Sequence, residues 1–87
     1  MADLQTELGN LIDMLVAQYG YMVFGRDREK IVSSESYRAE DFARDVLVAD
    51  GLNVDENLGS YRKVRNLFVE RFGHFVCTED FEEHEKI

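Results

Sequence analysis

Three stretches of this sequence carry apolar residues at helical spacing, and a glycine follows each of them directly, in a chain without proline. Proline is the strongest helix breaker, so nothing in the chain forces these stretches apart from within. Glycine is the residue that most often closes a helix, because it adopts the left-handed conformation without a steric penalty. The pattern therefore predicts three main helices, over about residues 4–19, 38–50 and 57–72.

The first predicted helix has an unusually wide apolar face. Its stripe is formed by Leu4, Leu8, Leu11, Ile12, Leu15 and Tyr19. Met14 and Val16 flank the stripe and extend the face to roughly 200° at about 100° per residue. A helix at the rim of a small monomer needs less apolar surface than this. The width predicts that helix 4–19 is either central to the fold or shared with a partner, including a second copy in a homodimer.

Short apolar runs between the helices predict one or two short β-strands. Tyr21 to Phe24 is the first such run, residues 30–33 form the second, and residues 74–77 the third. The first two would make a hairpin around the polar turn between them, and a short helix is the competing interpretation for this region. The expected fold is mainly α: a compact bundle of three main helices with short strands at 21–24, 30–33 or 74–77. Eighty-seven residues predict one domain, 1–87.

The charge of the chain favours some partners over others. It has 18 acidic residues against 10 lysines and arginines, a net charge of −8. Such a surface repels phosphates and anionic lipids and attracts basic proteins, so nucleic acid and membrane are disfavoured as partners. The sequence starts without a basic leader or a long apolar run, and its single cysteine, Cys77, has no intramolecular partner. We therefore expect a cytoplasmic protein.

One segment is basic against this background. Residues 58–73 contain four lysines and arginines and one glutamate, for a net charge of +3. A basic helix that follows another helix is typical of a helix-turn-helix regulator, and residues 60–71, with Arg62, Lys63 and Arg65, are the candidate DNA contacts. The connection to the preceding helix is longer than the usual three to four residues. Lys63, Arg65 and Arg71 also project in different directions around the helix, whereas DNA binding needs the positive charge focused.

Patterns for metals and cofactors are weak. His74, Cys77 and His84 have side chains that suit zinc, but their spacing matches no familiar zinc motif. A calcium-like start at Asn53 lacks the glycine and the terminal glutamate of a calcium loop. The sequence has no glycine-rich phosphate loop. We expect no metal, no cofactor and no catalytic activity.

The function that remains is a non-enzymatic protein-interaction module, an acidic adaptor or inhibitor whose protein partner is basic or itself binds nucleic acid. The alternative is the small DNA-binding regulator that uses residues 60–71. The residues expected to contact a protein partner are acidic side chains and the two residues that widen the first helix: Asp41, Asp45, Glu79, Asp80, Glu82, Glu83, Met14 and Val16.

Overall fold

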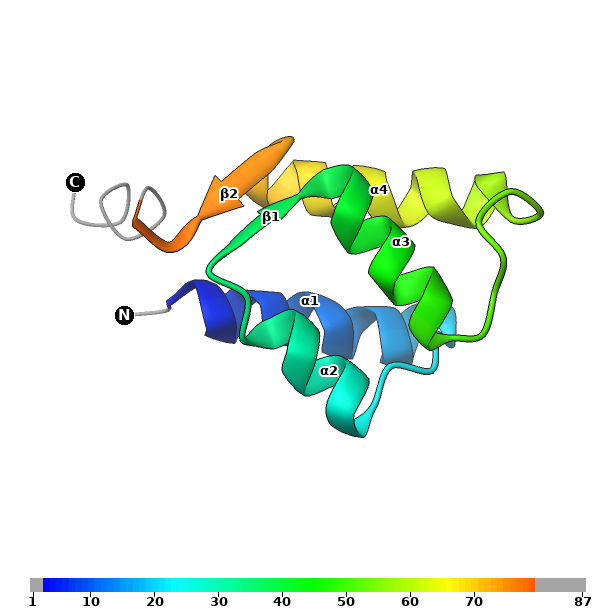
Figure 1. The fold of residues 1–87 in the computed structure, drawn as a ribbon, viewed down its shortest axis with the longest axis horizontal. Helices are drawn as coiled ribbons and strands as arrows, with labels where there is room; N and C mark the ends of the chain where they lie inside the picture. The colour runs from blue at the N-terminus through cyan, green and yellow to red at the C-terminus, as the bar shows by residue number, and fades with distance from the viewer. Residues whose placement is uncertain (1–2, 80–87) are drawn as a thin grey trace.

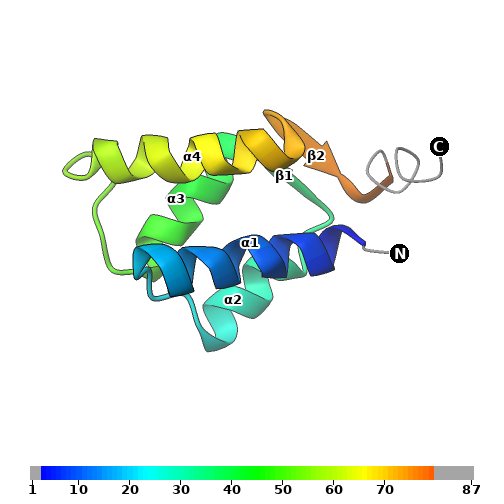
Figure 2. The same ribbon diagram turned by 180° about the vertical axis from the view of Figure 1, so that it is seen from behind.

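The computed structural model describes residues 3–79, and it places four helices and a two-stranded sheet around one core. In Figure 1, α4 lies across the top, α1 lies below it, and α3 runs obliquely between the two. Figure 2 shows the same arrangement from behind, with α1 and α4 nearer the viewer. The bounds are α1 Leu4–Tyr19, α2 Gly25–Val32, β1 Ser36–Arg38, α3 Ala39–Ala49, α4 Leu58–Phe72 and β2 Phe75–Cys77.

Helix α1 forms as its sequence predicts. The Asp3 carboxylate accepts a hydrogen bond from the Thr6 N–H at 2.7 Å, which satisfies one of the free amides at the helix start. Gly20 ends the helix with φ 76°, the left-handed conformation. All the aliphatic residues of the stripe are completely buried: Leu4, Leu8, Leu11, Ile12 and Leu15. The prediction that this helix is central to the fold is confirmed.

The predicted hairpin over 21–24 and 30–33 is wrong, and the competing short helix is correct. Residues 21–24 connect α1 to α2 without pairing to another strand. Tyr21 and Val23 are buried while Met22 and Phe24 are exposed, and the Met22 N–H donates to Asp50 Oδ1 at 2.9 Å. A side chain thus takes the place of a neighbouring strand. Residues 30–33 lie on α2 and in the turn that follows it.

The strand expected at 74–77 exists as β2, and its partner comes from a segment that carries no strand signal. β1 pairs with β2 in antiparallel register, with Tyr37 opposite Val76. Both of these side chains are buried, whereas their neighbours in β1 are exposed. The Ala39 N–H, at the start of α3, donates to the His74 carbonyl at 2.9 Å. The small sheet thereby ties the end of α4 to the start of α3.

Helices α3 and α4 pack on each other along their apolar faces. The end of α3 at the predicted glycine is a Schellman ending: the Leu52 N–H donates to the Leu47 carbonyl at 2.9 Å, and the Gly51 N–H to the Val48 carbonyl at 3.0 Å. In α4, Val64 and Phe68 are fully buried.

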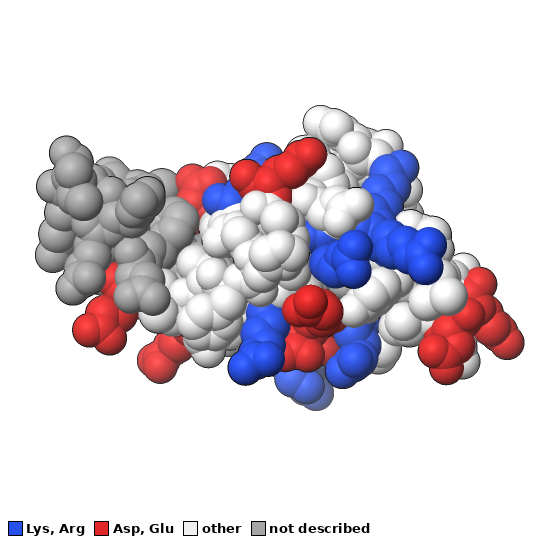
Figure 3. Space-filling model, turned by 90° about the horizontal axis from the view of Figure 1, so that it is seen from above, with Lys and Arg blue, Asp and Glu red and all other residues white. Residues whose placement is uncertain are grey.

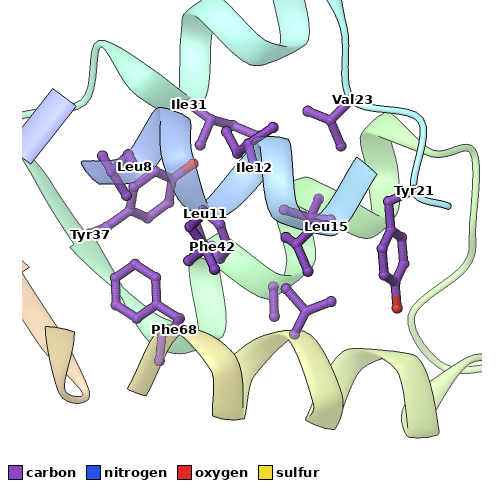
Figure 4. Close-up of a cluster of buried hydrophobic side chains, with 14 of the residues drawn as sticks. Leu8, Leu11, Ile12, Leu15, Tyr21, Val23, Ile31, Tyr37, Phe42 and Phe68 are labelled. Carbon is purple, nitrogen blue, oxygen red and sulfur yellow. The ribbon is translucent and has the colours of Figure 1, made fainter. Parts of the chain in front are cut away.

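The core lies where α1, α3 and α4 meet, and aromatic rings fill its centre. Figure 4 shows side chains from α1 pointing toward Phe42 and Phe68. The Phe68 ring centroid lies 4.9 Å from that of Phe42 and 4.9 Å from that of Phe72. Tyr37 meets both Phe42 and Phe68 edge-on, at 5.6 Å and 6.3 Å. These contacts hold β1 against α3 and α4, and so fix the position of the surface described next.

Candidate functional site

The described surface is hollowed along the junction of α2 and α3. The larger hollow, of about 400 Å³, is lined by Lys30, Ser34, Ser36, Tyr37, Arg38, Asp41, Asp45 and Phe75. A smaller hollow of about 80 Å³ is lined by Asp27, Lys30, Ile31, Asp45, Val48 and Ala49. Lys30 and Asp45 border both hollows, so the two hollows adjoin. We name the pair the α2–α3 groove.

One stripe of α3 forms a wall of this groove. Asp41, Asp45 and Val48 are spaced by four and three residues, so they share one face of the helix. All three are exposed, and the side opposite them on α3 carries the buried Phe42 and Val46. At a rise of 1.5 Å per residue, the stripe extends for about 10 Å. That length accommodates about two turns of a helix or a few residues of extended chain.

The floor of the groove is organised by Tyr37. Its ring is buried against the core, while its hydroxyl group donates a hydrogen bond to the Asp45 carboxylate. Burial raises the pKa of the Tyr37 hydroxyl well above its ordinary value, and the hydrogen bond and charge of Asp45 raise it further. A hydrogen bond with Ser34 acts in the opposite direction, and the charge of Asp41 adds to the increase. The protonated hydroxyl therefore holds the Asp45 side chain in a fixed position.

Two basic side chains, Lys30 and Arg38, line the larger hollow together with the two aspartates. Lys30 comes from α2 and Arg38 from the end of β1, and neither forms an ion pair with any residue in the part of the chain that the structure describes. Asp41 lies 3.8 Å from Arg44, one helical turn away, in an exposed and therefore weak pair. The lining of the larger hollow thus combines two aspartates, two basic side chains and the half-exposed ring of Phe75.

Exposed apolar side chains mark the end of the groove that the smaller hollow forms. Val48 is 63% exposed, and Met22 and Phe24 are 63% and 57% exposed. The bond between the Met22 N–H and Asp50 brings the α1–α2 connection beside the end of α3. Exposed apolar side chains of this size, grouped at one corner, are typical of a surface that another molecule covers.

The predicted partner residues do not form one cluster. Asp41 and Asp45 line the groove together, whereas Glu79 follows β2 and borders a different hollow, beside Thr78 and Glu35. Asp80, Glu82 and Glu83 lie outside the described residues. Met14 and Val16 are half-buried and pack against the core of their own chain. The apolar face that suggested a homodimer through α1 is largely covered from within.

The cations of α4 have several local partners. The Lys63 ammonium lies 4.1 Å from the centroid of the Tyr19 ring on α1, and the Arg71 guanidinium lies 3.9 Å from Glu7. Arg65 Nη2 is 3.4 Å from Asn66 Oδ1, and Arg62 is exposed. Figure 3, which looks down on α4, shows Lys and Arg side chains gathered toward the end where this helix begins. Eight residues, 50–57, separate α3 from α4, more than a helix-turn-helix uses.

The remaining candidates carry little chemistry. Within residues 3–79, no three histidine, cysteine or carboxylate side chains come together as a metal site. His74 is exposed, Cys77 is half-buried, and His84 falls outside the described residues. None of the described helices is long and apolar enough to cross a membrane.

Comparison with protein-family models, with curated proteins and with solved structures finds no match for this chain.

Sequence reasoning identified the two aspartates of the groove but missed three residues that shape it. Tyr37 is the single apolar residue of β1, and one residue gives no periodic signal. Lys30 falls in residues 30–33, and the strand interpretation of that segment does not place it beside α3. Phe75 was expected in a strand, and its exposure follows from the register with β1, which turns Val76 inward instead. Alternation within residues 75–77 was the available signal, since successive strand residues face opposite sides.

Proposed function

We propose that this protein is a non-enzymatic protein-interaction module, an adaptor or inhibitor, and that its partner binds in the α2–α3 groove. The observation that carries the proposal is the pair of adjoining hollows along Asp41, Asp45 and Val48, in which Val48 is itself an exposed apolar side chain. Protein partners favour surfaces that combine an apolar anchor with a polar rim. The groove offers both on two packed helices.

A pair of matched surface variants tests this proposal. Val48→Glu places a charge in the groove, and Leu58→Glu makes the same change on another exposed apolar residue, at the start of α4. Both side chains are substantially exposed, so both variants should fold. Affinity capture from native extract should recover a partner with the unmodified protein and with Leu58→Glu, and lose it with Val48→Glu. Equal recovery with both variants would place the contact elsewhere.

A second candidate function is binding to nucleic acid through α4. It is favoured by three cations within about one turn of α4, Arg62, Lys63 and Arg65, and by the Lys and Arg side chains that Figure 3 shows toward the start of this helix. The net charge of −8 opposes it, although at physiological salt the screening length of about 8 Å confines that repulsion to nearby groups. A mobility-shift assay with random duplex DNA at low salt distinguishes the two. Retardation that disappears in an Arg62→Ala, Lys63→Ala double variant would favour the nucleic-acid function.

A further inference from the structure

The electrostatic character of the groove floor indicates which charge an occupant should carry. The Tyr37 hydroxyl lies at the floor of the groove, where it donates a hydrogen bond to Asp45 and is close enough to Asp41 for the charge of that carboxylate to raise the pKa of the hydroxyl. The lining of the larger hollow also holds two cations, Lys30 and Arg38. The smaller hollow adds a third carboxylate, Asp27. Three carboxylates against two cations, in a chain with a net charge of −8, favour a positively charged group inside the groove.

The groove also offers apolar contacts on either side of these carboxylates. Phe75, at one end, exposes 53% of its surface, and Val48 stands at the other. A guanidinium or ammonium group gains from the face of an aromatic ring, and the aliphatic stems of arginine and lysine pack on apolar surface. The smaller hollow, walled by Ile31, Val48 and Ala49, has a volume of about 80 Å³. This is on the scale of a small aliphatic side chain.

We propose that the occupant of the α2–α3 groove is a basic segment of a partner protein. An arginine or lysine of that segment lies between Asp41 and Asp45 with its stem against Phe75, and an aliphatic side chain enters the smaller hollow beside Val48. Carboxylates bind such cations through charge-assisted hydrogen bonds, the strongest kind available at a surface. This inference rests on the proposed function, because it names the chemistry of the partner for the same site.

Two other occupants fit the groove less well. A second copy of the chain would bring a net charge of −8 against an identical charge. The phosphates of a nucleic acid would meet Asp41 and Asp45 directly, whereas the cations of α4 lie on a different helix. A basic segment avoids both repulsions.

Titration with two synthetic peptides, followed by NMR of the isotope-labelled full chain, tests the inference. Both peptides are short, with an alanine–glutamine background and one leucine. The first carries an arginine one helical turn from the leucine, and the second carries glutamate in its place. The arginine peptide should shift the amide signals of Asp41, Asp45 and Val48 at low salt, and the shifts should weaken as salt is added. The glutamate peptide should leave these signals unchanged.

Two asparagine variants and a matched control identify the carboxylates involved. Asp41→Asn and Asp45→Asn should each lower the affinity for the arginine peptide about threefold, which is the effect of losing one exposed ion pair. The amide oxygen of asparagine still accepts the Tyr37 hydrogen bond, so the Asp45 variant should fold. Asp55→Asn makes the same charge change in the α3–α4 connection and should have no effect.

Several results would overturn the inference. The inference is contradicted if the arginine peptide causes no shifts at millimolar concentration, or if the glutamate peptide binds equally well. It is also contradicted if Asp55→Asn weakens peptide binding as much as the two groove variants do, or if the peptide shifts only signals of α4. Shifts of the groove amides that depend on protein concentration without peptide would identify a second copy as the occupant instead. If peptide binding fails while Val48→Glu still abolishes capture of a partner, the groove remains the interaction site and the basic chemistry of the partner is wrong.

Discussion

Replacing Phe68 with alanine removes the ring at the centre of the core. Phe68 is fully buried and touches the rings of Tyr37, Phe42 and Phe72. A buried phenylalanine truncated to alanine costs about 3–5 kcal/mol, because transfer free energy is lost and a cavity remains. A chain of 87 residues has a total stability of about 4–13 kcal/mol at the usual range per residue. Phe68→Ala should therefore remove a large part of the free energy of unfolding.

Chemical denaturation followed by circular dichroism measures this loss, with Phe75→Ala as the control. Phe75 loses the same atoms but is 53% exposed, so its substitution should cost about 1 kcal/mol. The Phe68 variant should melt at least about 12 °C below the parent, since 1 kcal/mol corresponds to about 4–8 °C in a domain of this size. If the two variants lose equal stability, the assignment of Phe68 to the centre of the core is incorrect.

Four further substitutions test local features of the fold. Gly73→Ala should destabilise the protein by about 1–3 kcal/mol, because Gly73 has φ 83° and ψ −169°, a region essentially restricted to glycine. Gly59 lies on α4 with open space around it. Gly59→Ala should therefore stabilise the protein by about 0.5–1 kcal/mol in the same denaturation assay. Because the folded pKa of Tyr37 is raised, stability is full below the unfolded value of 10.0 and falls as the pH rises above it. Tyr37→Phe should lessen this alkaline loss in denaturation curves recorded from pH 9 upward, and an unchanged slope would contradict the burial of the hydroxyl. Hydrogen bonds from Thr6 lower the pKa of the Asp3 carboxyl group. The stability that Asp3 contributes is therefore fully present above pH 3.8, its ordinary pKa, and is lost as the pH falls through its pKa in the folded protein. The protection of the Thr6 amide relative to its intrinsic exchange rate should fall in that acidic range, and Asp3→Ala should lower this protection at every pH.

Periodic sequence patterns predicted the parts of the fold that depend on local rules. The stripe of α1, its Asp3 cap and the ending of α3 at Gly51 each follow from interactions within a few residues. Residues 21–24 misled the prediction for a physical reason. Their alternation of buried and exposed side chains is strand-like, but the backbone partner of Met22 is the Asp50 side chain, 28 positions away. Long-range pairing of this kind leaves no local signal.

The groove was predictable in part, through its charges. Asp41 and Asp45 share a helix face with Val48, and the spacing alone places them together. The rest of the groove lining depends on α2, for which the sequence left a strand at residues 30–33 and a short helix as alternatives, and on β1, whose pairing with β2 joins residues about 40 positions apart. For Met14 and Val16 the sequence suggested a contact with a partner that the packing of the chain partly replaces. Their apolar character suggested an outer contact, whereas the chain packs both against its own core.

Hydrogen exchange of the complex with a captured partner tests the central claim most directly. The claim is that a partner covers the groove along α3. Binding should slow amide exchange across α2 and over residues 41–48, beyond the protection that these helices have in the free protein, and leave residues 58–66 of α4 as they were. Added protection confined to residues 58–66, with the groove unchanged, would contradict the account and identify the basic end of α4 as the binding surface.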